Sequence, residues 1–273
     1  MDPRSILRTA LAHSARAYSE SLLSSSAVAT KDSKLRDVVG PSDTHVDEVV
    51  CRYLLSQGIS VLSEESSNLE NPAEFLAVLD PLDGSSNQLL GIPEFGTILG
   101  ITSREGLVTG GIALHSMGIT VIEADGRLQF SRRPTAPSSN VVGPAFLAYG
   151  SEVNELEGTS VRTLVLSDPT IFPGFHRIGS VAAGAVRFLL GQYSSFICIG
   201  VRLWDALGIL PLLSTRRDVE LLYSIDRGRI SVICVGRDLP YASILLNDSL
   251  CQSRFDPKLL TSDTILNSLS ELE

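Results

Sequence analysis

The sequence predicts a protein of mixed α and β structure in two halves, an α+β half over residues 1–140 and an α/β half over residues 141–273. Two amphipathic helical patterns open the chain, and short apolar segments separated by glycine-containing turns follow them. Beyond an aperiodic stretch rich in proline and serine, residues 131–144, strand patterns alternate with helical ones. These three observations place the boundary between the halves in that stretch.

The first half begins with two helices. Ile6, Leu7, Ala10 and Leu11 fall on one helical face, and residues 46–54 repeat that spacing after 42–44, three residues of N-cap type. Residues 59–62 form a short apolar segment, and apolar segments that end at turns then predict strands at 75–80, 96–101, 107–114, 119–123 and 128–130. We expect the last four to form an antiparallel meander.

The second half combines strands and helices. Helical patterns cover residues 180–190 and 205–214. Strands are predicted at 162–166, 194–199, 219–223 and 230–235.

Composition excludes several classes of protein. Of the 273 residues, 44% are hydrophobic and 19% charged, which excludes a disordered chain, and the net charge of −9 argues against nucleic-acid or anionic-membrane partners. The four cysteines show no metal-ligand spacing, so we expect free thiols in a reducing cytoplasm. The N-terminal segment has too many charges for a signal peptide, and no run of about 18 apolar residues predicts a membrane span.

Acidic residues gather where two apolar segments end. In DPLDGSSN, Asp80 ends one segment, Pro81 is expected to stop the strand ladder, and Asp83 lies in a turn closed by Gly84. In SEES, residues 63–66, an acidic pair ends another segment. Two carboxylates about 4 Å apart repel by roughly 4 kcal/mol at an effective dielectric constant of 20, so they require a cation or a shared proton. Oxygen ligands would select Mg²⁺, Mn²⁺ or Ca²⁺, whereas the plainer alternative is an Asp-rich turn after a strand.

The succession of SEES, DPLDGSSN and LWDALG resembles the inositol monophosphatase family. That family lies within a wider superfamily of Mg²⁺-dependent, lithium-sensitive phosphatases, which includes fructose bisphosphatases and bisphosphate nucleotidases. The resemblance extends from about residue 31 to residue 214. It implies an αβαβα layered sandwich of the sugar phosphatase type and a homodimer. It also implies two or three Mg²⁺ ions, replaceable by Mn²⁺, with inhibition by Ca²⁺ or Li⁺.

The resemblance also assigns roles to individual residues. It implies that the metal ligands are the side chains of Glu64, Asp80, Asp83 and Asp205 and the backbone carbonyl of Leu82. The residues that it implies for orienting or supporting the attacking water are Asp43, Glu65 and Ser85. Those that it implies for contacting the substrate are Asp83, Gly84, Ser85, Ser86, Gly179, Ser180 and Asp205. Plainer readings are helix N-caps at Asp43 and Ser180 and a helix-dipole carboxylate at Asp205.

Departures from the family bear on the substrate. Cys198 stands seven residues before Asp205, where inositol-specific members carry an acidic residue, so we do not expect inositol specificity. Arg216 and Arg217 stand near the place of a family Gly-Gly pair, and either meet a second phosphate or remain solvated. We expect a phosphatase of a small polyol or sugar phosphate. The alternatives are a 3'(2'),5'-bisphosphate nucleotidase, a fructose-1,6-bisphosphatase or, from another class, an inactive sugar-phosphate binding module.

Overall fold

The computed structural model describes residues 2–23, 29–30, 38–69, 73–132, 143–149, 174–236 and 253–270. Its seven-stranded sheet comprises, in spatial order, β4 (Ser67–Asn68), β3 (Ser60–Ser63), β5 (Phe75–Asp83), β6 (Gly96–Ser103), β7 (Gly106–Leu114), β8 (Ile119–Ala124) and β9 (Arg127–Phe130). The six-stranded sheet comprises β11 (Phe175–His176), β10 (Ala145–Tyr149), β12 (Ser195–Arg202), β14 (Arg229–Gly236), β13 (Val219–Asp226) and β15 (Ser253–Arg254). The short strands β1 (Ala29–Thr30) and β2 (Val38–Val39) pair with each other.

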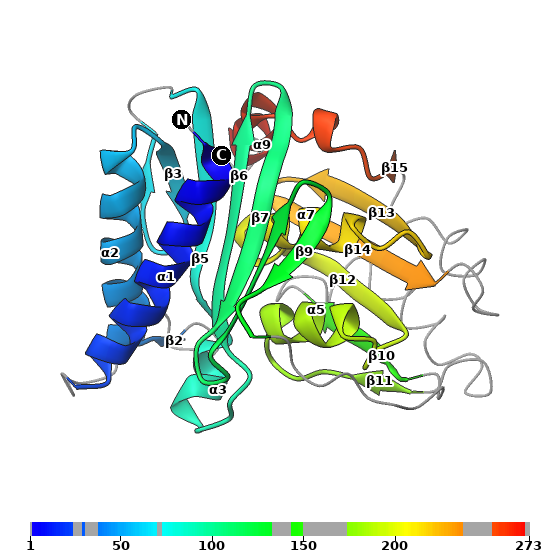
Figure 1. Ribbon diagram of the computed structural model, residues 1–273, viewed down its shortest axis with the longest axis horizontal. Helices are drawn as coiled ribbons and strands as arrows, with labels where there is room; N and C mark the ends of the chain where they lie inside the picture. The colour runs from blue at the N-terminus through cyan, green and yellow to red at the C-terminus, as the bar shows by residue number, and fades with distance from the viewer. Residues whose placement is uncertain are drawn as a thin grey trace.

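The helices complete a layered arrangement. Among the described residues they are α1 (Pro3–Ser21), α2 (Pro41–Ser56), α3 (Ser85–Leu89), α5 (Val181–Leu189), α6 (Leu203–Ala206), the 3-10 turn η1 (Leu207–Ile209), α7 (Leu210–Ser214), the 3-10 turn η2 (Pro257–Leu259) and α9 (Ser262–Ser270). Figure 1 shows α1 and α2 covering one face of the seven-stranded sheet, with α5 and α7 between the two sheets. The described layers thus follow the predicted order α, β, α, β, and the fifth layer has no counterpart within the described residues. In that part of the chain no helix has both the length and the apolar character to cross a bilayer.

Most of the predicted elements are present. The segments from residue 96 onward form the antiparallel meander β6 to β9, and those at 194–199, 219–223 and 230–235 are β12, β13 and β14. The predicted strand at 162–166 lies outside the described residues. The helix expected over 205–214 is instead three short pieces, α6, η1 and α7, which begin at Leu203.

Helix α2 begins earlier than its N-cap residue types suggested. Its N-cap is Gly40, Pro41 occupies the first turn, and the Asp43 carboxylate accepts a hydrogen bond from the Gly40 amide at 2.9 Å. A proline suits the first helical turn because the amide that it lacks would have no helical partner there. The expectation that the helix starts after 42–44 was therefore wrong.

Strand β5 continues past Pro81, contrary to the prediction. Asp80 pairs with Ile98 and Asp83 with Gly96, so β5 carries one residue more than β6 between these pairs. Such a bulge accommodates a proline because the ladder is already interrupted there. Asp83 therefore ends the strand instead of lying in the turn.

The two sheets share one hydrophobic core. Along β5, Ala77 and Leu79 pack with α1 and α2, whereas Leu76 and Val78 face a larger cluster that includes Phe196 of the second sheet. Both faces of β5 are therefore buried, which holds its carboxyl end in place. The domain boundary at residue 140 stays a prediction, because residues 133–142 lie outside the described part of the chain.

Three glycines bring the second half against the first sheet. A Cβ added to Gly208 in η1 would lie 2.6 Å from the Leu99 carbonyl oxygen, and one added to Gly110 would lie 2.1 Å from the Gly208 oxygen. Gly100 likewise faces Gly208 at 3.1 Å. The chain that follows Asp205 can therefore approach β6 and β7 only without side chains.

Candidate active site

Two parallel strands bring the predicted acidic motifs to one sheet edge. Ser63 of β3 pairs with Leu79 of β5 in a parallel register, and the Glu64 amide donates to the Leu79 carbonyl at 3.1 Å. Glu64 follows β3 directly, and Asp80 follows Leu79 along β5. Because the carboxyl ends of parallel strands meet at the same edge, these two acidic residues lie side by side.

Asp80 is the most enclosed of the acidic residues. Its side chain is buried, and one carboxylate oxygen accepts a hydrogen bond from the Leu82 amide at 3.0 Å. Burial raises the pKa of Asp80 well above its usual value, and the nearby negative charges raise it further. These charges belong to Glu64, Asp83, Asp205 and Asp43, which together with Asp80 we call the acidic cluster.

Asp205 joins the acidic cluster from the second half of the chain. It lies in the first turn of α6, where a carboxylate oxygen accepts a hydrogen bond from the Arg202 amide at 2.9 Å. Burial raises the pKa of Asp205 well above its usual value, and the charges of Glu64 and Asp83 add to this effect. Asp205 therefore combines the helix-terminal role of the plainer reading with a place in the cluster.

Asp83 is held by the start of α5. Its carboxylate accepts hydrogen bonds from the Val181 amide at 3.0 Å, the Ala182 amide at 2.9 Å and the Ser180 hydroxyl. Burial raises the pKa of Asp83, although these hydrogen bonds oppose the rise. Ser180 is also the N-cap of α5, through a bond from the Ala183 amide at 3.1 Å. Asp83 therefore connects the end of β5 to the first turn of a helix in the other half.

The turn after Asp83 packs closely on the segment before α5. Gly84 has a φ of 81°, and a Cβ there would lie 2.9 Å from the Glu94 oxygen and 3.0 Å from the Ser180 Cβ. Asn87 donates to the carbonyl oxygens of Ile178 at 2.6 Å and Glu94 at 2.7 Å. No role was predicted for Asn87, although it belongs to the DPLDGSSN motif. It joins this motif to the segment that holds Gly179 and Ser180.

The remaining predicted residues lie around the acidic cluster. Ser85 and Ser86 begin α3 directly after its N-cap Gly84, and Leu82 is buried in the β5 bulge. Asp43 is buried and raises the pKa of Asp80, so the first turn of α2 contributes a carboxylate to the cluster. Glu65 follows Glu64 and is partly buried. Their catalytic and binding roles stay predictions.

A partly buried histidine supports the β5 bulge from behind. The Thr97 hydroxyl donates to the Pro81 carbonyl at 2.8 Å and lies 2.9 Å from His115 Nε2, and the His115 ring stacks on Tyr18 at 4.8 Å. Burial lowers the pKa of His115 to about 4, so its imidazole is neutral near pH 7. The sequence offered no sign of this contact, because Thr97 is 18 residues away from His115 along the chain.

The acidic cluster has the donor atoms that a hard divalent cation prefers. Within the described residues, no three Asp, Glu, His or Cys side chains converge closely enough to coordinate one ion as they stand. The cluster nevertheless contains only oxygen donors, and the raised pKa values of Asp80 and Asp205 show that their charged forms lack compensation. A divalent cation would stabilise those charged forms. The residues therefore fit such an ion.

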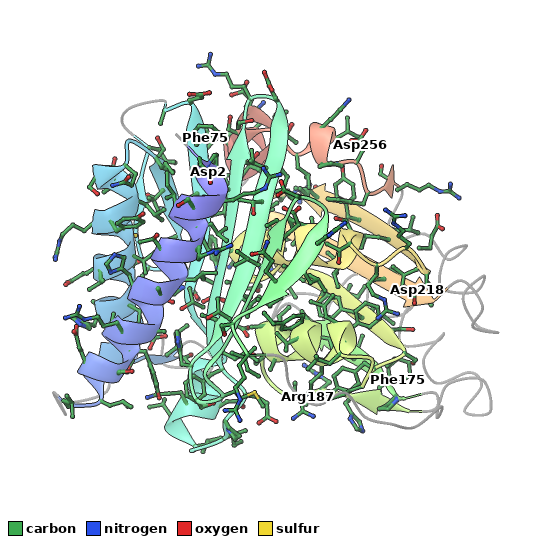
Figure 2. All side chains as sticks on the ribbon, viewed as in Figure 1. Asp2, Phe75, Phe175, Arg187, Asp218 and Asp256 are labelled. Atoms are coloured by element: carbon green, nitrogen blue, oxygen red, sulfur yellow. The ribbon has the colours of Figure 1, made fainter. Side chains whose placement is uncertain are left out.

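Arg216 lies at the opposite end of α5 from the acidic cluster. Its guanidinium donates to the Phe188 carbonyl at 3.3 Å and pairs with Asp218. Phe188 follows Ser180 by eight residues, or about 12 Å along the helix. Figure 2 shows Asp218 at the far end of the six-stranded sheet, well away from α3. The structure thus favours the alternative in which Arg216 meets no second phosphate.

Cys198 lies in the core between the sheets. It is completely buried, in the same cluster as apolar side chains of α5 and β12. The departure from inositol specificity that this position suggested stays a prediction.

Residues 3–213 match the sequence pattern of the inositol monophosphatase family. The chain belongs to this family. It is similar to a fructose-1,6-bisphosphatase/inositol-1-monophosphatase of Thermococcus kodakarensis, with 36% identity over 76 residues, which are 28% of this chain and 30% of that protein. The matched region thus spans about a third of this curated relative.

Solved structures of family members share the fold over most of their length. The inositol monophosphatase of Anabaena aligns with a TM-score of 0.69 and 20% identity, covering 89% of this chain and 94% of that one. An IMPase/NADP phosphatase complexed with Mg²⁺ and phosphate aligns with a TM-score of 0.68 and 14% identity, covering 92% and 97%. At such identities the likeness shows the fold alone.

Proposed function

We propose that this family member is a Mg²⁺-dependent phosphoric monoester hydrolase that acts on a small polyol or sugar phosphate. The observation that carries the proposal is the acidic cluster, to which Glu64, Asp80 and Asp205 come from three separate segments. Carboxylates that raise one another's pKa around a buried member such as Asp80 destabilise a fold unless a ligand compensates them. The neighbour complexed with Mg²⁺ and phosphate supports such a ligand.

In this proposal the residues have separate roles in metal binding, in orienting water and in binding phosphate. Glu64, Asp80, Asp83, Asp205 and the Leu82 carbonyl would hold two or three ions. Bound Mg²⁺ supplies a water of lowered pKa and offsets the charge of the phosphoryl group. In this proposal Ser85 and Asp43 aim that water along the ester bond, and Glu65 supports them. The backbone amides of 84–86, at the start of α3, face the phosphate oxygens.

One position supports the proposed substrate class. Cys198 stands where inositol-specific members carry an acidic residue, which favours a sugar phosphate. A second candidate is fructose-1,6-bisphosphatase activity, because that name is carried by the relatives from Thermococcus kodakarensis and Pyrococcus furiosus. We also propose a cytoplasmic homodimer, on the family resemblance and the low cysteine content.

Phosphate release from a panel of sugar, inositol and nucleotide phosphates tests this function. We expect turnover with Mg²⁺, its loss in EDTA, and inhibition by Li⁺. Asp80→Asn should lower activity by about a hundredfold or more, because it removes a buried ligand. Asp125→Asn is the control, since that carboxylate is 85% exposed.

Activity that survives EDTA, or that persists in Asp80→Asn, would show that the metal mechanism is wrong. Binding of sugar phosphates without turnover of any ester on the panel would favour the inactive binding module. Preference for a bisphosphate within the panel would identify one of the narrower alternatives.

A further inference from the structure

Glu64 and Glu65 form the loop of a two-residue hairpin. β3 and β4 pair antiparallel through Val61 with Asn68 and Leu62 with Ser67, and the Ser63 amide donates to the Ser66 carbonyl at 2.8 Å. β4 is only two residues long and exposed. The strand ladder therefore stabilises this loop little on its own.

The loop also lacks the backbone geometry that two-residue hairpins favour. The preferred turns have positive φ at one or both central residues, which matches the twist of the flanking strands. Among the described residues, those other than glycine with positive φ are Asp125 and Arg227, so neither Glu64 nor Glu65 has it. Another contact must therefore help to hold the loop in shape.

Asp47 of α2 supplies such a contact. Its side chain is buried, and its two carboxylate oxygens accept hydrogen bonds from the hydroxyls of Ser63 at 2.5 Å and Ser66 at 2.7 Å. These serines stand immediately before and after the two glutamates. A carboxylate suits this position because two separate oxygens each accept a charge-assisted bond, whereas an amide has one acceptor.

We propose that Asp47 is a positioning residue, which bridges Ser63 and Ser66 and so holds Glu64 and Glu65 at the acidic cluster. The inference rests on the proposed function only in treating Glu64 as a metal ligand. Neither serine hydroxyl needs to touch metal or substrate. The role is therefore separable from direct ligation.

The test compares Asp47→Ala, Asp47→Asn and Ser66→Ala with Glu48→Gln, which removes an exposed charge from the same helix. Mg²⁺ affinity is measured by calorimetry without substrate, and hydrogen exchange is followed at the amides of Ser63 and Glu64. In Asp47→Ala we expect Mg²⁺ binding to weaken about tenfold or more and both amides to exchange at least tenfold faster. Asp47→Asn should show smaller changes in Mg²⁺ affinity and in amide exchange than Asp47→Ala, and Glu48→Gln should match the wild type in both measurements.

Unchanged Mg²⁺ affinity and unchanged exchange in Asp47→Ala would overturn the proposal. If that variant does not fold, Ser66→Ala decides by the same criteria, because it removes only a hydroxyl from an exposed residue. Weakened Mg²⁺ binding without faster exchange would also overturn it, since the hairpin would not have moved. A wild type that binds Mg²⁺ but hydrolyses no ester would contradict the proposed function and leave this test intact.

Discussion

Asp80 and Asp83 stand three positions apart in one motif, yet their surroundings differ. Asp83 accepts three hydrogen bonds from the first turn of α5 and its N-cap. Asp80 accepts one, from the Leu82 amide, and its pKa is raised by four other carboxylates. Helix amides and the helix dipole stabilise the charge of Asp83. Asp80 therefore depends more on a bound cation than Asp83 does.

At this scale the sequence could identify the acidic residues but not their partners. The motif DPLDGSSN predicted that Asp80 and Asp83 would converge, the family resemblance added Glu64, and the charges of Asp83 and Glu64 both raise the pKa of Asp80. The donors to Asp83 come from a segment 97 residues away, and the serines on Asp47 become neighbours only when β3 packs on α2. Such contacts depend on the tertiary fold, which local patterns do not contain.

His115 should make stability depend on pH. Its pKa is about 4 in the folded protein against 6.5 for an unperturbed histidine, so between these values the unfolded chain binds the extra proton. This contribution is fully present above pH 6.5 and is lost as pH falls toward 4, by up to about 1.4 kcal/mol per pH unit.

Urea unfolding at pH 7 and pH 5 measures this contribution. From pH 7 to pH 5 the free energy of unfolding should fall by on the order of 1–2 kcal/mol more in the wild type than in His115→Gln. In that variant the glutamine amide can take the place of Nε2 in the contact with Thr97. The carboxylates titrate in both proteins and cancel in the comparison. Equal losses would mean that His115 is not protonated on unfolding in this range.

Among the elements, α3 and α5 depend on the glycine between β5 and α3. Gly84 and Gly91 both have positive φ, 81° and 71°, but a Cβ on Gly84 would meet backbone at 2.9 Å, whereas one on Gly91 meets nothing within 4 Å. Gly91→Ala should therefore lower the free energy of unfolding by about 1 kcal/mol, because only the backbone conformation is strained. Gly84→Ala should cost about 2–4 kcal/mol, because overpacking adds to that strain.

Urea unfolding of the two variants checks this difference. Gly84→Ala should also lower Mg²⁺-dependent phosphate release, since the contact that it disturbs adjoins Ser180, a partner of Asp83. Gly91→Ala should leave turnover near that of the wild type. Equal destabilisation of the two variants would contradict the steric argument.

Element positions followed from hydrophobic periodicity where the pattern was long and regular. The meander and α5 were predicted in this way, because alternation and helical spacing report directly on buried faces. The continuation of β5 through Pro81 was missed, since a bulge depends on the register with β6. The break within 203–214 reflects the close packing of Gly208 on the first sheet, which depends on a distant strand.

For the whole molecule, the decisive contact is the one between the halves at Gly208. A Cβ on Gly208 would lie 2.6 Å from the backbone carbon and oxygen of Leu99. These are backbone atoms, which cannot move aside as the end of a flexible side chain could. Gly208→Ala should destabilise the fold by about 2–4 kcal/mol and weaken Mg²⁺ binding, because Asp205 lies one helical turn away. Gly118→Ala, at an open turn with a φ of 60°, is the matched control.

Thermal unfolding and Mg²⁺ calorimetry of both variants test this contact. The control should lose about 1 kcal/mol and keep its Mg²⁺ affinity, because only its backbone conformation is strained. A Gly208→Ala protein at least as stable as the control would contradict the steric argument, because the halves could then separate slightly for about 1 kcal/mol or less. Unchanged Mg²⁺ affinity in a destabilised variant would show that Asp205 is positioned independently of this contact.

Asp83 and Glu64 differ in their surroundings, and this difference bears on how homologues are separated into active enzymes and inactive relatives. A descendant that abandons catalysis still needs a carboxylate at position 83 to accept the amides in the first turn of α5, so selection for folding preserves it. Position 64 is exposed in a short loop and does not begin a helix, so selection for folding should act on it less than on the buried carboxylate at 83 once the metal is no longer used. Genome surveys should therefore weigh the glutamate at 64 more heavily than the second aspartate of the DPLD motif when they separate active enzymes from inactive relatives.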